Sequence, residues 1–352
     1  MERTKVPEQP LSDQMKSKVN ATIQSVPKYD GYFPGNNIST GSTLLDLAIS
    51  GGRIRGGGLP GGILVEIFGP SGSGKTVLLS EIAGSVQRHG GEIMFHDPEA
   101  RLNKQFAKMF GLTLEDTDYS QPDTVPEVFE AVRAWEPKKK KDIIHGVFAD
   151  SLAALSTNME MENKDGDKMG MRRAKEFSEE LRKTARVIAK DNYLMVCSNQ
   201  VRENLDAGPY GQKYKSPGGE SIGFYSSLRL RTFKAEKIKE KRKIEGKEIM
   251  RVVGVNVQIE VFKSSIWKPF RTAPVIILFD YGIDDIRANL QFIKDHSKNT
   301  TYTLSGESLS NSMNEAIAYI ESENKQELLR QEVISLWNHI ESQFKQERKS
   351  KR

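Results

Sequence analysis

Residues 62–76 read Gly-Ile-Leu-Val-Glu-Ile-Phe-Gly-Pro-Ser-Gly-Ser-Gly-Lys-Thr, and this segment determines the fold class. Its first part, residues 63–68, is a short continuous apolar run, which is typical of a strand buried on both faces. Residues 69–76 then match the spacing G-x-x-x-x-G-K-[ST], and residues 77–88 carry apolar side chains at helical spacing. A strand, a glycine loop and a helix in this order form a phosphate-binding loop. The sequence therefore predicts a nucleoside triphosphate site, and a chance glycine turn is the alternative.

The glycines of this loop allow backbone N–H groups to surround an anion, and the following helix points its positive end at the same place. Within the loop, Lys75 is expected to reach the β- and γ-phosphates, and the Thr76 hydroxyl is expected to bind Mg²⁺. The residues predicted to hold the nucleotide here are Gly69, Pro70, Ser71, Gly72, Ser73, Gly74, Lys75, Thr76 and Val77.

The whole chain has 352 residues and a net charge of +5, which suggests one large domain with appendages or two domains, and only weakly favours a polyanionic partner. Its single cysteine, Cys197, excludes intramolecular disulfides and is expected to be a buried thiol, because it lies in an apolar run. No segment is long enough to span a membrane, and the polar N-terminus is not a signal peptide. We therefore expect a cytoplasmic protein without a membrane partner.

Strands and helices alternate after the loop, which predicts an α/β fold with a doubly wound, mainly parallel sheet. Strands are predicted at residues 91–97, 143–150 and 192–199, and helices at 103–110, 125–135 and 171–190. Three later strands are separated by turns, so the sheet should finish with antiparallel members. These strands are predicted at residues 227–234, 250–263 and 272–280.

Two further segments are distinctive in composition. Residues 234–247 are crowded with lysine and are predicted to be a protruding hairpin tip, which is either solvated or in contact with DNA. The chain from about residue 283 onward is polar and is predicted to be helical, at 312–322 and 325–346, before a basic end.

Polar residues follow the predicted strands. Asp150 ends an apolar strand where a second metal-positioning carboxylate belongs, although it could be an ordinary strand-end acid. Glu99 follows the strand at 92–97, which we expect directly beside the loop strand, and could accept a proton from the attacking water. Asp97 and Glu66 are the alternatives for that base. Gln200 ends the next strand and is either a contact to the γ-phosphate or a strand-end cap.

Two long polar loops without periodicity follow these strands, at residues 159–169 and 203–219. The second combines glycine with aromatic and basic side chains, which suits single-stranded nucleic acid through base stacking and phosphate contacts. Loops of this length are either functional or disordered, and composition leaves both readings open.

Taken together, these stretches resemble the bacterial RecA recombinase family, including its phage-encoded members. The matching pieces run in the order of the family from Ile38 to Gly282 and comprise Ile38-Ser-Thr-Gly-Ser-Thr-Leu-Leu-Asp46, the loop at 69–76, His96-Asp-Pro-Glu99-Ala, Asp150-Ser-Leu-Ala-Ala-Leu155, Asp167-Lys-Met-Gly170, Ser198-Asn-Gln200-Val-Arg202, Gly218-Gly219, Phe224-Tyr-Ser-Ser-Leu-Arg229, Val261-Phe-Lys263 and Pro269-Phe270. The phosphate loop is common to many families, whereas Glu99, Asn199-Gln200 and Gly218-Gly219 together are far more specific.

The resemblance implies roles for residues at the ATP site. Glu99 would activate the attacking water, Gln200 would sense the γ-phosphate, and Lys263 would reach across to the ATP of a neighbouring subunit. Phe106 would stack on adenine, with Asn103 in place of the aspartate that is usual nearby. Thr76 and Asp150 would hold Mg²⁺.

The resemblance also implies that the two long loops line a filament axis and hold single-stranded DNA. Residues expected at DNA or near it are Met169, Gly170, Arg172, Arg173, Lys175, Arg182, Arg202, Tyr210, Lys213, Tyr214, Lys215, Gly218 and Gly219. On this basis the chain divides into an N-terminal helical arm for polymerisation at 1–35, with a helix at 12–25, a RecA-like ATPase core at 36–283, and a mainly helical C-terminal region at 284–352.

Some positions depart from the pattern of the family. The second of two cross-subunit lysines is Ser265 here, so that role could pass to Lys268. The C-terminus is basic where bacterial members usually end in an acidic tail, so we expect duplex DNA to be captured without neutralisation of a tail. A solvated tail that does not contact DNA is the alternative.

The function implied by the resemblance is an ATP- and Mg²⁺-dependent recombination and repair protein. It would polymerise on single-stranded DNA as a helical filament, pair it with duplex DNA and exchange strands, with DNA-stimulated ATP hydrolysis. A loader or single-strand-binding protein is a candidate partner, and the SOS response a candidate setting. The alternatives are a hexameric helicase-type motor and a weakly hydrolysing mediator.

Overall fold

The computed structural model describes residues 37–51, 57–115, 118–138, 143–157, 169–200, 202–203, 214–215, 220–233, 235–346 and 348. The helix predicted at 12–25, and most of both predicted DNA-binding loops, lie outside these residues. No helix in this part of the chain is both long and apolar enough to span a membrane.

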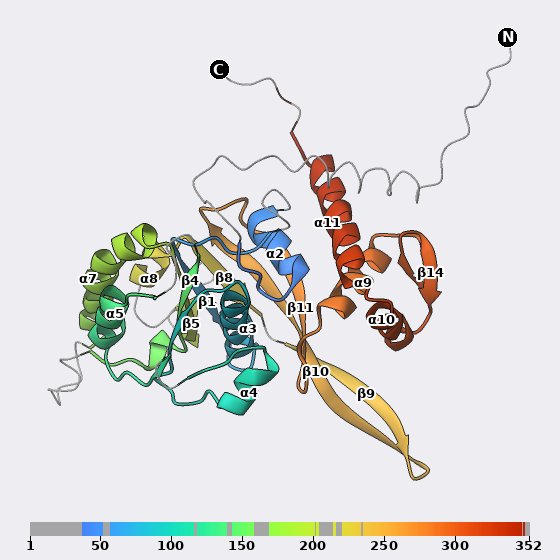
Figure 1. Ribbon diagram of the computed structural model, residues 1–352, viewed down its shortest axis with the longest axis horizontal. Helices are drawn as coiled ribbons and strands as arrows, with labels where there is room; N and C mark the ends of the chain where they lie inside the picture. The colour runs from blue at the N-terminus through green and yellow to red at the C-terminus, as the bar shows by residue number, and fades with distance from the viewer. Residues whose placement is uncertain are drawn as a thin grey trace.

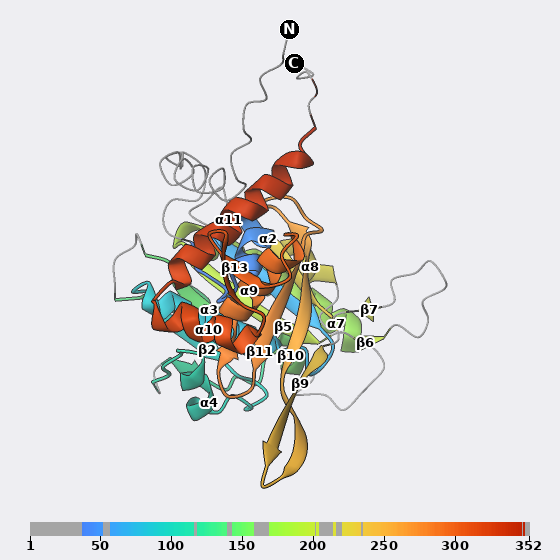
Figure 2. The ribbon, with the colours of Figure 1, turned by 90° about the vertical axis from the view of Figure 1, so that its right-hand side faces the viewer.

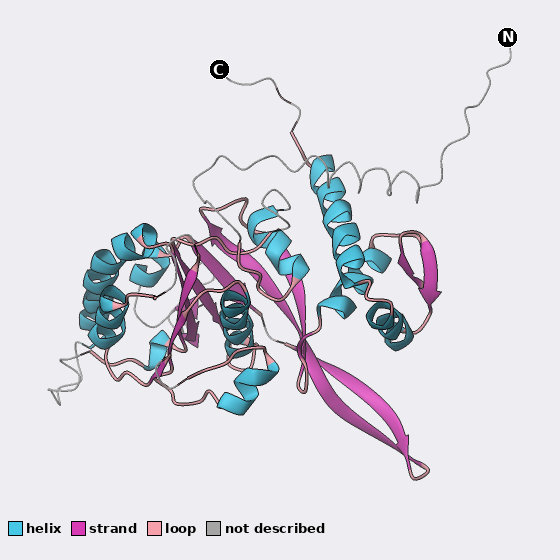
Figure 3. Ribbon diagram, viewed as in Figure 1, coloured by secondary structure: helices cyan, strands magenta, loops and turns pink. Residues whose placement is uncertain are grey.

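Ten of the described strands form one sheet in the order β12-β11-β10-β8-β1-β5-β4-β2-β3, with β9 paired to β10 (Figures 1 and 3). Their bounds are β1 Ile63–Gly69, β2 Ile93–His96, β3 Tyr119–Ser120, β4 His145–Ala149, β5 Tyr193–Gln200, β8 Leu228–Thr232, β9 Glu236–Ile244, β10 Lys247–Ser264, β11 Thr272–Leu278 and β12 Gly282–Ile283. Neighbours from β3 to β8 are parallel, whereas β9, β10, β11 and β12 pair antiparallel. The prediction of a parallel sheet with an antiparallel finish is confirmed.

The position of β2 corrects one prediction. β5 and β4 lie between β1 and β2, so the strand that precedes Glu99 is not beside the loop strand. Burial explains the order, because β4 is buried along its whole length and β5 along all but its last residue, whereas β2 is short and partly exposed. The strands with the longer buried runs therefore lie nearer the centre of a sheet that is covered on both faces.

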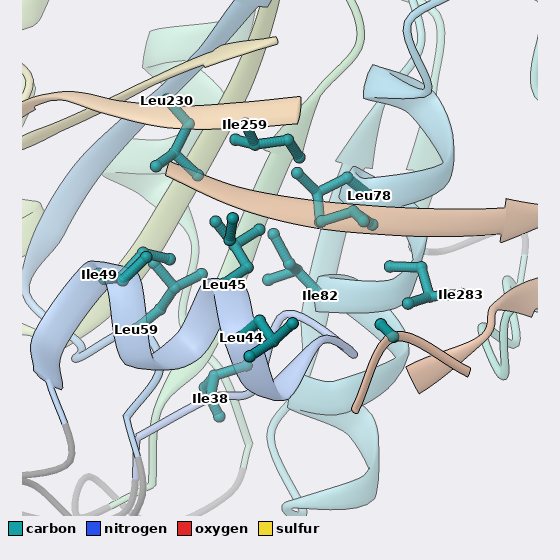
Figure 4. Packing of buried hydrophobic residues seen from close by; sticks show 14 of the residues in the cluster. Ile38, Leu44, Leu45, Ile49, Leu59, Leu78, Ile82, Leu230, Ile259 and Ile283 are labelled. Atoms are coloured by element: carbon teal, nitrogen blue, oxygen red, sulfur yellow. The ribbon is translucent and has the colours of Figure 1, made fainter. Parts of the chain in front are cut away.

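Helices cover both faces of this sheet (Figure 1). One layer holds α2 (Thr43–Ser50) and α3 (Lys75–Arg88); the other holds α5 (Val125–Ala134), α7 (Met169–Lys190) and α8 (Glu220–Tyr225). Because alternate residues of a strand point to opposite faces, Leu64 packs in the cluster with α5 and α7, whereas Val65 packs in the cluster with α2 and α3. Figure 4 shows the cluster that contains Val65, in which side chains of α2 and α3 pack beneath Leu230 and Ile259.

The lysine-rich stretch corrects a second prediction. The β9–β10 hairpin projects beyond the body of the molecule in both views, as predicted, but most of residues 234–247 form strand β9 rather than the tip (Figures 1 and 2). The turn itself is only Glu245 and Gly246, both at positive φ, as two-residue hairpins require. A cross-strand ion pair between Lys241 and Glu248, at 2.5 Å, favours the pairing of this highly charged sequence as a strand.

The C-terminal region is helical as predicted, with one exception. Its helices are α9 (Asp285–Asp295), α10 (Met313–Ser322) and α11 (Gln326–Gln343). Between α9 and α10, however, the strands β13 (Tyr302–Leu304) and β14 (Glu307–Ser310) form a small hairpin, which corrects the expectation of helices alone. Ser305 and Gly306 connect these strands at positive φ. An ion pair between Arg271 and Glu341, at 2.7 Å, joins α11 to the start of β11.

Candidate active site

A cleft of about 460 Å³ opens where the parallel strands end, and residues 71–77 form one of its walls. Parallel strands carry their carboxyl ends to the same edge, and the register places Gly69 of β1 directly beside Gln200 of β5. The cleft brings together Lys75, Thr76 and Asp150, which the sequence separates by up to 75 positions, along with Gln200. Ligands of α/β folds bind at such edges.

Packing fixes the conformation of the glycine loop. Gly74 caps α3 at φ 77°, and a Cβ there would lie 2.4 Å from the Ile277 side chain. A Cβ on Gly69 would lie 2.0 Å from the Thr232 hydroxyl oxygen, which is also 2.7 Å from the Ser73 hydroxyl. The loop therefore rests against β8 and β11, and both glycines are needed for that approach.

Lys75 begins α3, and its ammonium folds back over the loop. Nζ donates hydrogen bonds to the carbonyl oxygens of Gly69, at 3.2 Å, and of Pro70, at 2.7 Å. Burial lowers the pKa of Lys75, and the negative charges of Asp150 and Glu99 act in the opposite direction. Because its direct partners are neutral, a phosphate anion would compete effectively for this ammonium.

Asp150 follows β4 and accepts hydrogen bonds from two hydroxyls. Thr76 Oγ1 lies 2.6 Å from Asp150 Oδ2, and Ser198 Oγ donates to Asp150 Oδ1. Burial raises the pKa of Asp150; these hydroxyls counter the shift, and the charges of Asp97 and Glu99 add to it. A buried carboxylate surrounded by hydroxyl oxygens is the donor set that a hard cation such as Mg²⁺ prefers, so the residues fit that ion.

Glu99 lies on a tight turn after β2, and both of its carboxylate oxygens have partners. Oε1 accepts hydrogen bonds from Ser151 Oγ, at 2.9 Å, and Gln200 Nε2, at 3.3 Å. Oε2 lies 2.6 Å from Nη1 of Arg101, a cleft residue that the sequence analysis did not single out.

Asp97 and Glu66, the two alternatives to Glu99 as the base, form structural hydrogen bonds outside the cleft. Asp97 Oδ2 accepts the Leu102 N–H and the Tyr119 hydroxyl, each at 2.8 Å, which fixes the turn. Glu66 is fully buried within β1, where it accepts hydrogen bonds from Asn199, at 3.0 Å, and Arg229, at 2.6 Å. Neither carboxylate lines the cleft, so the geometry favours Glu99 as the acid that faces it.

Three aromatic side chains, Phe106, Phe110 and Phe279, also line the cleft. Phe106 of α4 (Lys104–Met109) is 40% exposed and packs edge-on against Phe110, with ring centroids 4.6 Å apart. Phe279, directly after β11, is 47% exposed and faces the same space. Phe110 and Phe279 were not predicted; an aromatic residue directly after a strand was the available signal. Asn103 caps α4 by accepting the Gln105 N–H at 2.8 Å and is not among the described cleft residues.

Lys263 lies away from this cleft, on β10. Its ammonium donates to the carbonyl oxygens of Gly223, at 2.8 Å, and Phe224, at 3.1 Å, at the end of α8. Burial and the neighbouring Arg229 lower the pKa of Lys263, and Glu66 opposes that shift. The Phe224 side chain beside it is 76% exposed.

The predicted DNA residues fall into three groups. On α7, Arg173 donates to the carbonyl oxygens of Ala153 and Leu155, whereas the side chains of Lys175 and Arg182 are exposed. Met169, Gly170 and Arg172 lie in the first turn of the same helix. The second group, Arg202, Tyr214 and Lys215, lies in two short paired strands, β6 (Arg202–Glu203) and β7 (Tyr214–Lys215). Tyr210, Lys213, Gly218 and Gly219 lie outside the described residues.

Comparison with known proteins gives consistent matches. Residues 25–284 match the family described as the RecA N-terminal domain. Protein RecA from Thermus thermophilus is 38% identical over 250 residues, which cover 71% of this chain and 68% of that protein. Protein RecA from Macrococcus caseolyticus is 36% identical over 249 residues, which cover 70% of this chain and 65% of that protein.

Proposed function

The chain belongs to the RecA family, and on that premise we propose that it is a DNA-dependent ATPase and strand-exchange recombinase that polymerises on single-stranded DNA. The observation that carries the proposal is the convergence of Lys75, Thr76, Asp150 and Glu99 on one cleft, with Gln200 against Glu99. Those side chains are what ATP hydrolysis needs from a protein, namely a phosphate cradle, a metal site and a carboxylate for water.

ATP would lie with its phosphates along residues 69–76 and its base between Phe106 and Phe279. Lys75 would exchange the loop carbonyls for phosphate oxygens, because an anion is a stronger partner for an ammonium than a neutral carbonyl. Thr76 and Asp150 would hold Mg²⁺, which supplies charge neutralisation at the phosphates. The positive charge of that ion would also offset the cost of desolvating the Asp150 carboxylate.

Glu99 would orient the attacking water and receive its proton. Gln200 donates to the same carboxylate and is the last residue of β5, where the chain leaves the sheet toward residues 203–219. A shift of Gln200 toward the γ-phosphate would therefore affect both Glu99 and that loop. This linkage supports coupling between nucleotide state and DNA binding.

The proposal extends to the rest of the chain. Residues 1–35 would join neighbouring subunits of a helical filament, and Lys263 would act at the ATP of a neighbour. Single-stranded DNA would follow residues 159–169 and 203–219 with Lys175, Arg182 and Arg202, and residues 284–352 would capture duplex DNA. A cytoplasmic location and help from a loader or single-strand-binding protein complete the proposal.

Strand exchange between a circular single strand and a homologous linear duplex tests the proposal. We expect nicked circular product that requires ATP, Mg²⁺ and an intact Lys75. Electron microscopy on single-stranded DNA should show open helical filaments. Closed rings, with duplex unwinding in place of exchange, would instead identify a helicase-type motor, and DNA binding without turnover would identify a mediator.

A further inference from the structure

Arg101 is a cleft residue for which the mechanism above has no role. Its guanidinium lies 2.6 Å from Glu99 Oε2, its side chain is 72% exposed, and it lines the same cleft as residues 71–77. The other oxygen of Glu99 already accepts hydrogen bonds from Ser151 and Gln200. With Arg101 in this position, both oxygens of Glu99 are engaged, and the guanidinium occupies a site at Oε2 that could otherwise receive a proton from water.

The backbone around Arg101 is fixed, whereas its side chain is not. Ala100 adopts φ 53° and its N–H donates to the Asp97 carbonyl at 3.0 Å. The Leu102 N–H donates to Asp97 Oδ2, and Leu102 itself is buried. The exposed guanidinium, by contrast, pairs with Glu99, which is its ion-pair partner among the residues that the structure describes. The Glu99 side chain is only 16% exposed, but it keeps Ser151 and Gln200 as hydrogen-bond donors, so departure of the exposed Arg101 side chain does not leave this carboxylate without partners.

The charges of the cleft indicate the second partner. Among the described residues that line it, the cations are Lys75 and Arg101, and the acids are Glu99 and Asp150. Lys75 belongs to the loop itself, so Arg101 is the cation on the side of Glu99. A terminal phosphate carries more charge than a carboxylate and offers three oxygens to the planar, forked donors of a guanidinium.

We propose that Arg101 is a catalytic residue that changes partners, pairing with Glu99 in the free protein and with the terminal phosphate when a nucleoside triphosphate is bound. The inference rests on the proposed function. The exchange places positive charge on the phosphate and frees Glu99 Oε2 at the same moment. The water oxygen then bonds to the terminal phosphorus, its proton passes to Glu99, and the bond to the bridging oxygen breaks with its electron pair leaving on the nucleoside diphosphate.

The test compares Arg101→Gln and Arg101→Lys with Arg242→Gln as a matched control. Arg242 is 76% exposed and pairs with Glu240 at 3.0 Å on the projecting hairpin. The Arg242→Gln variant therefore loses a similar ion pair far from the cleft. Affinities for ADP and for β,γ-imido-ATP are measured with Mg²⁺, and turnover is measured at saturating ATP and single-stranded DNA.

We expect Arg101→Gln to bind ADP as the wild type does, which also shows that it is folded. Its affinity for β,γ-imido-ATP and its turnover should each fall about 10-fold or more, the size of one lost charge-assisted hydrogen bond. Arg101→Lys should retain part of both, and Arg242→Gln should match the wild type.

Turnover of Arg101→Gln at or above the wild-type rate would overturn the inference, as would equal losses of affinity for ADP and β,γ-imido-ATP. Failure of the proposed function itself has a different signature. In that case the wild type would not hydrolyse ATP, or Lys75→Ala would hydrolyse it equally well, whatever the behaviour of Arg101.

Discussion

Two carboxylates in different parts of the molecule, the buried Asp46 and the partly buried Asp150 of the cleft, differ in how their hydrogen-bond partners are arranged. Burial raises the pKa of both, to about 6 for Asp46. Asp46 lies inside α2 and accepts hydrogen bonds from Ser39 Oγ, at 2.6 Å, and from the N–H and hydroxyl of Thr40, at 2.8 and 2.7 Å. These three donors belong to one turn, which Asp46 ties to the helix.

Asp150, in contrast, receives its hydrogen bonds from two different elements and opens onto the cleft. Thr76 comes from α3 and Ser198 from β5, and both donors are hydroxyls that could serve other partners. Hydrogen bonds within its own turn offset part of the desolvation of Asp46, whereas a bound cation would offset that of Asp150. The comparison predicts that substitution of Asp150 lowers turnover with little effect on stability, whereas substitution of Asp46 lowers stability with no effect on turnover.

The largest expected effect is on turnover. Asp150→Asn should lower ATP hydrolysis by about 100-fold or more, because it removes the charge that would hold Mg²⁺. Its unfolding free energy should stay within about 1 kcal/mol of the wild type or rise, since Asn can still pair with both hydroxyls. Turnover at saturating ATP and chemical denaturation measure the two.

Asp46→Asn is the control for that experiment, because it removes the same charge from a buried site outside the cleft. Its turnover per folded molecule should equal that of the wild type. Equal losses of turnover in Asp46→Asn and Asp150→Asn would contradict a specific role of Asp150 in hydrolysis.

The next effect is on stability. Asp46→Ala leaves the Thr40 N–H and two hydroxyls without their acceptor in a buried turn, so the unfolding free energy should fall by about 3 kcal/mol. Chemical denaturation near pH 5 gives the value, and turnover of the folded variant should be unchanged. An unfolding free energy equal to that of the wild type would show that the turn does not depend on Asp46.

The smallest effect is a pH dependence. The folded-state pKa of Asp46, about 6, lies above its unfolded value, so the native state binds more protons between about pH 4 and 6. Its contribution to stability is therefore complete at low pH and is lost as the pH rises through 6. Glu81, whose pKa burial also raises to about 6, adds to the slope in the same direction.

Comparison of the wild type with Asp46→Asn isolates the contribution of Asp46, because asparagine does not titrate. Between about pH 4.5 and 7 the wild type should lose about 2 kcal/mol of unfolding free energy relative to the variant. A constant difference across that range would mean that the Asp46 pKa is not raised in the folded protein.

Much of the fold could be predicted from the sequence because it depends on short-range patterns. The apolar run at 63–68, the glycine loop and the helix after it are local signals, and β1 and α3 match them within about two residues. Asp150 was found for the same reason, since a carboxylate at the end of an apolar strand needs no knowledge of the partner strands.

The remaining features of the fold and the cleft depend on contacts between segments that are distant in the sequence, which local sequence patterns do not encode. The strand order places β5 and β4 between β2 and β1, and the lysine-rich β9 is a strand only because β10 lies opposite it. Arg101 and Phe279 face the cleft because of where their turns fold, and neither has a motif of its own. Lys263, chosen from resemblance for the ATP of a neighbouring subunit, donates to carbonyl oxygens of α8, and its role at a neighbour stays a prediction.

The most direct test of the account is the steady-state ATPase rate of the wild type and Glu99→Gln, with and without single-stranded DNA, at low salt and near-micromolar protein. The account predicts that DNA strongly raises the wild-type rate. It also predicts that Glu99→Gln binds ATP and DNA normally but hydrolyses ATP at least about 100-fold more slowly, since an amide cannot accept the proton of water. A wild-type rate that DNA does not change, or normal hydrolysis by Glu99→Gln, would contradict it.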